Sequence, residues 1–141
     1  MIARSTPAAD AAARRAAELV TADVRRAFEA DGAVCLRGVL GVAEVHALAR
    51  GIDHNLAHPS PRAIVASAAG DPGRFVEDFC NWADNADYRA ICCASALPAV
   101  AAALTASRRV RLYHDHMLTK EPRTRQRTPW HQDQPYYNVE G

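Results

Sequence analysis

An alternating stretch near the end of the chain limits the fold most strongly. RRVRLYHDHMLTK, at residues 108–120, suits a β-strand, in which successive side chains point to opposite faces. One face would carry Val110, Leu112, His114, His116, Leu118 and Lys120. The other would carry Arg111, Tyr113, Asp115, Met117 and Thr119. The pattern predicts a strand, so the chain is not purely helical.

The residues before this stretch are mostly helical in pattern. Residues 42–57 repeat apolar side chains every three or four positions, which indicates an amphipathic helix. Thr21 and Asn85 suit helix N-caps because their side-chain oxygens can accept a backbone N–H. Gly32 is expected to end the helix that follows Thr21, since glycine tolerates positive φ.

Two further stretches are less clear. AVCLRGVL, at residues 33–40, is a short β-like run, and residues 74–85 are ambiguous. The chain is therefore expected to be one α+β domain over residues 1–141. Residues 1–107 would be mainly helical, and residues 108–141 would form a strand pair.

Composition excludes several functional classes. The 141 residues carry a net charge of +1, so no bulk charge attracts nucleic acid or an anionic membrane. The apolar run of residues 91–104 is interrupted by Pro98 and is shorter than the roughly 20 residues of a membrane span. Four cysteines without a C-x-x-C spacing predict reduced, buried thiols. We therefore expect a cytoplasmic protein that contacts neither nucleic acid nor membrane.

Basic residues gather late in the chain. They are Arg108, Arg109, Arg111, Lys120, Arg123, Arg125 and Arg127. A solvated strand edge and loop is the simpler interpretation. The alternative is a rim that attracts an anionic substrate or co-substrate.

The closing sequence, TPWHQDQPYYNVEG at residues 128–141, contains the candidate site. In an extended strand, His131 and Asp133 would project to the same side. An imidazole beside a carboxylate makes two thirds of a facial 2-His-1-carboxylate site, which suits Fe(II). Pro135 favours a loop, where Tyr136 and Tyr137 could line a pocket. A bare H-x-D is a short pattern, and a surface strand with ordinary hydrogen bonds would also contain it.

Longer stretches of sequence help to decide between an iron site and an ordinary surface strand. KEP (120–122) followed by TPWHQDQPYY (128–137) is the most specific part. FEADGAVCLRGVLGVAEVHALARGI (28–52) and FCNWADNADYRAICCASALPAVAAAL (79–104) extend it upstream. Together these stretches resemble the phytanoyl-CoA dioxygenase family of Fe(II)- and 2-oxoglutarate-dependent oxygenases.

The resemblance implies a double-stranded β-helix, a jelly-roll or cupin-like barrel, with iron near one mouth. His131 and Asp133 match the first two iron ligands, and no catalytic residue is implied beyond the metal ligands. Lys120 matches a contact for the carboxylates of 2-oxoglutarate, and Tyr137 matches an aromatic residue near the metal and substrate. The implied reaction hydroxylates a small-molecule C–H bond with dioxygen, while 2-oxoglutarate is decarboxylated to succinate.

The resemblance is incomplete. The family also needs a distal histidine and an arginine for 2-oxoglutarate, and neither has a matching position. A jelly roll has about eight strands, whereas about three candidates occur here. We therefore expect the N-terminal part of a longer oxygenase, with an incomplete barrel, that is inactive alone. His114 or His116 could serve as the third ligand, although the family offers no precedent.

Two other functions stay open. The chain could be a non-catalytic remnant that serves as an interaction module. It could instead be a module that binds Zn(II) through His131 and Asp133 without redox chemistry. For an oxygenase, the substrate could be a fatty acyl thioester, an amino acid derivative or a secondary metabolite.

Overall fold

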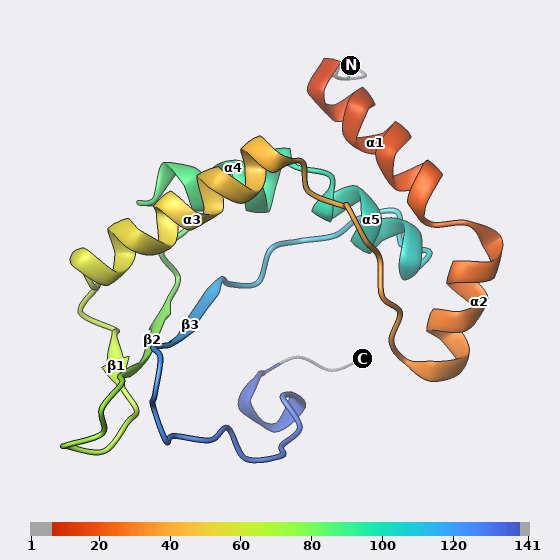
Figure 1. Cartoon of the computed structure of the whole chain (residues 1–141). Coiled ribbons are helices and arrows are strands. Elements are labelled where there is room, and N and C mark those ends of the chain that lie inside the picture. Colours follow the sequence, from red (N-terminus) through yellow and green to blue (C-terminus); the bar gives the residue numbers. More distant parts are fainter. Residues whose placement is uncertain (1–6, 139–141) are drawn as a thin grey trace.

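The computed structural model describes residues 7–138, which form five α-helices and one three-stranded antiparallel sheet (Figure 1). The helices are α1 (Pro7–Leu19), α2 (Ala22–Asp31), α3 (Val42–Ala57), α4 (Ala86–Ala94) and α5 (Leu97–Leu104). The strands are β1 (Ile64–Val65), β2 (Phe75–Phe79) and β3 (His116–Lys120), in the order β1-β2-β3, and a short 3-10 helix, η1 (Gln134–Tyr136), follows. The α+β class is confirmed. The jelly-roll barrel stays a prediction, because the described residues form an open sheet.

The predicted helix ends lie where local chemistry places them. Thr21 Oγ1 accepts the N–H of Val24 at 3.3 Å, and Asn85 Oδ1 accepts the N–H of Tyr88 at 3.1 Å. Gly32 has φ +71° and ends α2 in the left-handed conformation. These caps depend only on neighbouring residues, which explains why the sequence predicts them.

The first helical layer consists of α1, α2 and α5, which lie together at one end of the molecule (Figure 1). Its buried centre is Ala16, Val20 and Val100. The prediction of a strand at residues 33–40 is wrong, because this stretch has no sheet partner among residues 7–138. Its apolar side chains instead pack on that centre, as Leu36 and Val39 do.

The sheet lies at the other end, with β2 at its centre. The β2–β3 register pairs Phe75 with Lys120 and Phe79 with His116. The predicted strand at residues 108–120 is therefore correct only for its last five residues. Cys80, with φ +57°, turns the chain away after β2, so the residues before His116 have no strand with which to pair.

Alternation within β3 is confirmed where the strand exists. Met117 is buried beneath α3 and α4, whereas Leu118 is 55% exposed on the opposite face. The same alternation in β2 turns Val76 and Asp78 toward the helices. The sheet thus has one helix-covered face and one open face.

A buried polar network joins α3 to β2. Asp78, with 0% exposure, accepts hydrogen bonds from Asn55 Nδ2 at 2.8 Å, Ser60 N at 2.8 Å and Ser60 Oγ at 2.6 Å. Asn55 Oδ1 in turn accepts the hydroxyl of Tyr88 on α4. Burial, with the negative charges of Asp115 and Asp78 nearby, raises the pKa of Tyr88 to about 12. The phenol therefore stays protonated and donates.

The cysteines are free, but the prediction that they are buried is wrong. Cys35, Cys80 and Cys93 are exposed, and Cys92 is half-buried. Burial, with the nearby charge of Asp115, raises the pKa of the Cys92 thiol.

One stretch of residues 7–138, Ala86–Leu104, is long and apolar enough to cross a membrane by length and composition alone. This is weak evidence, because a core helix of a water-soluble protein has the same composition. The stretch is broken into α4 and α5 at Ser95, whose ψ of −176° is extended. The absence of a membrane span stays a prediction.

Candidate functional site

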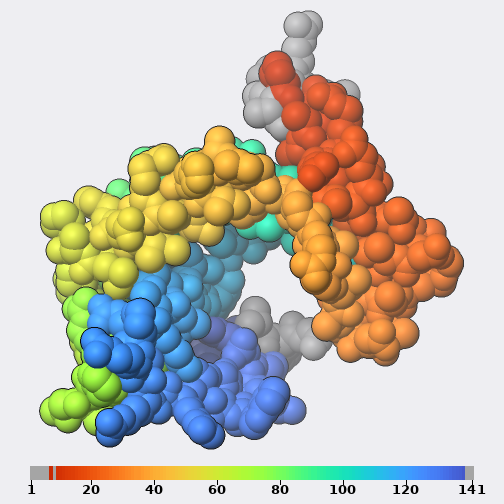
Figure 2. Space-filling model, in the orientation of Figure 1, coloured from red at the N-terminus to blue at the C-terminus, as the bar shows by residue number. Residues whose placement is uncertain are grey.

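A cleft of about 790 Å³ lies between the open face of the sheet and residues 121–138, which we call the C-terminal segment. Figure 2 shows the molecule hollowed at its centre, between the helical half and this segment. The floor of the cleft consists of Phe75, Glu77 and Phe79 from β2 and His116, Leu118 and Lys120 from β3. The C-terminal segment contributes Thr128, Pro129, His131, Asp133, Tyr136 and Tyr137.

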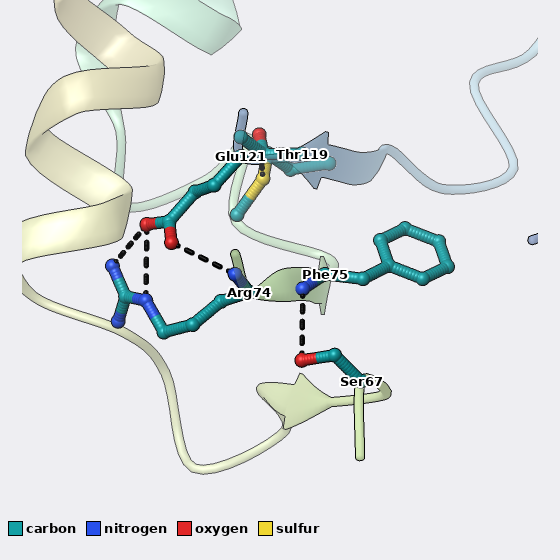
Figure 3. Close-up of polar contacts among 6 residues, drawn as sticks. Ser67, Arg74, Phe75, Thr119 and Glu121 are labelled. Carbon is teal, nitrogen blue, oxygen red and sulfur yellow. Dashed lines mark hydrogen bonds and ion pairs between the residues drawn. The ribbon is translucent and has the colours of Figure 1, made fainter. Parts of the chain in front are cut away.

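The start of the C-terminal segment is fixed to the entry of β2 (Figure 3). Glu121 accepts hydrogen bonds from Arg74 Nε at 3.0 Å and from the Arg74 backbone N–H at 2.9 Å. These bonds hold the pKa of Glu121 below its ordinary value. Asp71 accepts the Thr124 hydroxyl and the Arg125 backbone N–H, both at 2.9 Å. The path toward His131 is therefore set by contacts about fifty positions away in sequence.

A tight turn directs the segment away from β3. Thr124 N donates to Glu121 O at 3.2 Å, Pro122 occupies the second position and Arg123 has φ +71°. This arrangement is that of a type II turn, whose third position favours glycine.

Replacing Arg123 with glycine is therefore expected to stabilise the protein by about 1 kcal/mol, because glycine tolerates this φ without a Cβ clash. Denaturant unfolding at constant m-value measures this change. Arg127→Gly, at an exposed position without positive φ, is the control and should not stabilise. Equal changes in the free energy of unfolding for Arg123→Gly and Arg127→Gly would contradict a strained turn.

Aromatic contacts hold the far end of the segment. The Tyr137 ring lies 5.1 Å from the His114 ring and 5.5 Å from the Tyr113 ring, centroid to centroid. Its hydroxyl is 3.4 Å from His114 Nε2. The segment thus spans the cleft between two anchors, and His131 lies between them.

His131 and Asp133 lie side by side, with 3.1 Å between His131 Nε2 and Asp133 Oδ1. They are not on a strand: Asp133 has φ −75° and ψ −33°, and η1 follows directly. His131 Nδ1 is 2.8 Å from Pro129 O. Because a carbonyl only accepts, Nδ1 carries a hydrogen toward Pro129 O, and Nε2 faces the carboxylate.

This arrangement fits a shared cation. A lone pair and a carboxylate oxygen repel each other unless a proton or metal ion lies between them. If two ligand atoms each lie about 2.1 Å from one ion and the ligand–ion–ligand angle is a right angle, the two atoms are about 3.0 Å apart. The separation of His131 Nε2 and Asp133 Oδ1 is close to that value. The backbone carbonyl of Pro129 orients the imidazole as second partners of metal-bound histidines do.

Lys120 contributes a positive charge to the same cleft. Its Nζ donates to Thr128 Oγ1 at 2.8 Å and lies 4.8 Å from the centre of the Phe75 ring. Lys120 is therefore on the cleft floor with a defined orientation, and it is not paired with an acid among residues 7–138. An anionic ligand could bind to it.

A third metal ligand is not present in the described part of the chain. No three or more His, Cys, Asp or Glu side chains within residues 7–138 are placed to hold one ion. His116 lines the cleft, but neither it nor His114 completes the pair formed by His131 and Asp133.

The arginines of the C-terminal segment point to solvent. Arg123, Arg125 and Arg127 are exposed, and their guanidinium groups form no ion pair within residues 7–138. Attraction of an anionic ligand by these groups stays a prediction.

The β2 side of the cleft was not predicted from the sequence. Phe75, Glu77 and Phe79 alternate in FVEDF, a pattern that suits a strand. The stretch was ambiguous because it mixes aromatic and acidic residues. Its alternation, together with the prolines and glycines before it, was the available signal.

Comparison with known proteins gives one match. The profile of the family described as Phytanoyl-CoA dioxygenase (PhyH) matches residues 28–141. No curated protein and no solved structure matches the chain. The family match covers the sheet, the cleft and the H-x-D pair, and it leaves out α1 and most of α2.

Proposed function

The chain belongs to the phytanoyl-CoA dioxygenase family, and on that premise we propose that it serves Fe(II)- and 2-oxoglutarate-dependent hydroxylation of a small-molecule C–H bond. The family generally comprises oxygenases of this type, so dioxygenase-type chemistry is the family-level function. The observation that carries the finer proposal is the 3.1 Å separation of His131 Nε2 and Asp133 Oδ1.

The two proposed ligands have complementary roles. Asp133 contributes negative charge and His131 a neutral nitrogen donor, which together suit ferrous iron. The hydrogen bond from His131 Nδ1 to Pro129 O keeps Nε2 directed at the metal position. When bound, iron with 2-oxoglutarate and dioxygen would convert a substrate C–H into C–OH and 2-oxoglutarate into succinate and CO₂.

The remaining cleft residues would orient the small molecules. Lys120 would neutralise a carboxylate of 2-oxoglutarate, and Thr128 fixes the direction of its ammonium. Tyr137, positioned by His114, would border the substrate space. Leu118 and Phe79 add apolar surface that favours an organic substrate over bulk water.

Removing either proposed ligand should weaken metal binding by at least roughly tenfold. Water that replaces the lost side chain would supply neither its charge nor its fixed position. We expect His131→Ala and Asp133→Ala each to have this effect in anaerobic Fe(II) titrations followed by calorimetry. His46→Ala and Asp53→Ala, both at exposed positions of α3, are matched controls that should bind Fe(II) normally.

Adding 2-oxoglutarate separates the possible functions. An oxygenase site should develop a visible Fe(II) absorption band that depends on both 2-oxoglutarate and His131. Zn(II) binding at the pair without any response to 2-oxoglutarate would identify a zinc module instead. Unchanged Fe(II) affinity in both ligand variants would exclude a metal site there and leave the interaction module.

A further inference from the structure

The floor of the cleft holds a second polar pair, Glu77 and His116, away from the proposed metal ligands. We propose that Glu77 of this pair binds an ammonium group, and that the substrate is a small amine. The amine site stands on the geometry of the floor. Its identification as the substrate site rests on the proposed function.

Glu77 is a partly buried carboxylate without a hydrogen-bond donor. Its side chain is 23% exposed, and it accepts no hydrogen bond from residues 7–138. His116 Nε2 lies 3.4 Å from Glu77 Oε2, yet this buried nitrogen has no hydrogen-bond partner. The contact satisfies the distance for an ion pair but lacks hydrogen-bond geometry. The Glu77 carboxylate, which is partly exposed, therefore remains available to a donor, whereas His116 Nε2 is shielded from solvent.

The surroundings of Glu77 disfavour leaving its charge unpaired. Phe75 and Phe79 flank it on the same face of β2, and Leu118 lies directly across on β3. A carboxylate removed from water beside apolar groups is costly unless a cation or donor pairs with it. The permanent cation on the floor, Lys120, is instead held by Thr128 and the Phe75 ring. A ligand ammonium would supply the hydrogen-bond donor that Glu77 lacks.

The aromatic floor also favours a cation. Ring faces attract positive charge, and the Phe75 ring already has the Lys120 ammonium 4.8 Å from its centre. Phe79 is stacked on His116, with centroids 3.9 Å apart, which presents the imidazole edge beside Glu77. Glu77 would accept the N–H groups of the ligand, and the stacked rings of Phe79 and His116 would lie beside it. The floor therefore offers a carboxylate and an aromatic surface to one ammonium.

The experiment compares three probes of equal chain length: n-butylammonium, n-butyrate and n-butanol. Backbone amide shifts of the ¹⁵N-labelled chain report binding by residue. We expect n-butylammonium alone to shift amides of β2 and β3 in a saturable way. Glu77→Gln, which keeps the shape but removes the charge, should weaken this binding by roughly tenfold. Glu29→Gln, at an exposed position of α2, is the matched control and should bind as the native chain does.

Two further variants guard against misfolding. Glu77→Asp retains the charge and should bind more tightly than Glu77→Gln, whereas equal binding by the two would overturn the proposal. His116→Gln leaves the Glu77 carboxylate in place and should weaken binding less than Glu77→Gln does. Equal shifts from n-butyrate, or undiminished binding in Glu77→Gln, would also overturn it.

The two proposals fail separately. His131→Ala should lose Fe(II) binding but retain the n-butylammonium shifts. Loss of Fe(II) binding in Glu77→Gln, with no amine binding in the native chain, would make Glu77 and His116 part of a metal site and overturn the amine site. Amine binding without any Fe(II) binding would instead overturn the oxygenase and leave an amine-binding module.

Discussion

Asp78→Asn is expected to lower the free energy of unfolding by about 3 kcal/mol and the melting temperature by roughly 10 °C. Asp78 is fully buried, and both of its carboxylate oxygens accept hydrogen bonds. An asparagine side chain keeps one acceptor, and its NH₂ group faces either Asn55 Nδ2 and Ser60 N or Ser60 Oγ and Phe79 N. In each orientation at least one buried N–H group faces another donor.

Asn55 cannot relieve the conflict by rotating its amide. Its Oδ1 already accepts the Tyr88 hydroxyl at 3.2 Å and Asn81 Nδ2 at 3.4 Å. Rotation would break both contacts and loosen α4 from α3. Thermal and urea unfolding measure the effect. Asp53→Asn, at an exposed position of α3, is the control and should change stability by less than about 0.5 kcal/mol.

The Asp78 carboxylate also makes the free energy of unfolding depend on pH. Burial alone raises the pKa of Asp78, but hydrogen bonds from Ser60 and Asn55 outweigh it and hold the pKa well below its ordinary value. The stabilisation is therefore complete above the unfolded pKa of about 3.9 and is lost as pH falls further. The free energy of unfolding, measured between pH 6 and pH 3, should fall less steeply with decreasing pH in Asp78→Asn than in the native chain. Parallel curves would contradict this origin.

Gly73→Ala is expected to destabilise the protein by about 3 kcal/mol and to weaken Fe(II) binding without removing a ligand. A Cβ at Gly73 would lie 2.4 Å from Pro122 O and 2.6 Å from Thr124 N. Both are backbone atoms of the turn that starts the C-terminal segment, so they cannot move aside as a side chain does. The segment must shift, and His131 shifts with it.

Gly70→Ala separates this steric effect from a general effect of alanine. A Cβ at Gly70 meets nothing within 4 Å, although its φ of +85° strains any other residue. It should destabilise by about 1 kcal/mol and leave Fe(II) affinity unchanged. Equal metal affinity in Gly73→Ala and the native chain would show that the loop does not position the proposed metal ligands.

Local chemistry made much of the helical half predictable. The caps of α2 and α4 need only a side-chain oxygen three residues before its donor, and α3 needs only its apolar repeat. The shared face of His116, Leu118 and Lys120 likewise follows from strand alternation. The resemblance around TPWHQDQPYY indicated the family, and the match over residues 28–141 confirms it.

Other features depended on residues far apart in sequence. The sequence could not show that β3 begins only at His116, because β2 sets that limit by turning away at Cys80. Nor could it place Glu77 beside His116 or Asp78 beside Asn55, since each pair is joined by the packing of separate elements.

The sequence by itself determined the residue types, the caps and the two-residue spacing of His131 and Asp133. Tertiary structure alone decided that Arg74 and Asp71 hold the C-terminal segment over the sheet, and thereby formed a cleft. The physical reason is range: caps and alternation arise from neighbours along the chain, whereas a cleft requires distant backbone segments to be fixed against one another by hydrogen bonds and packing.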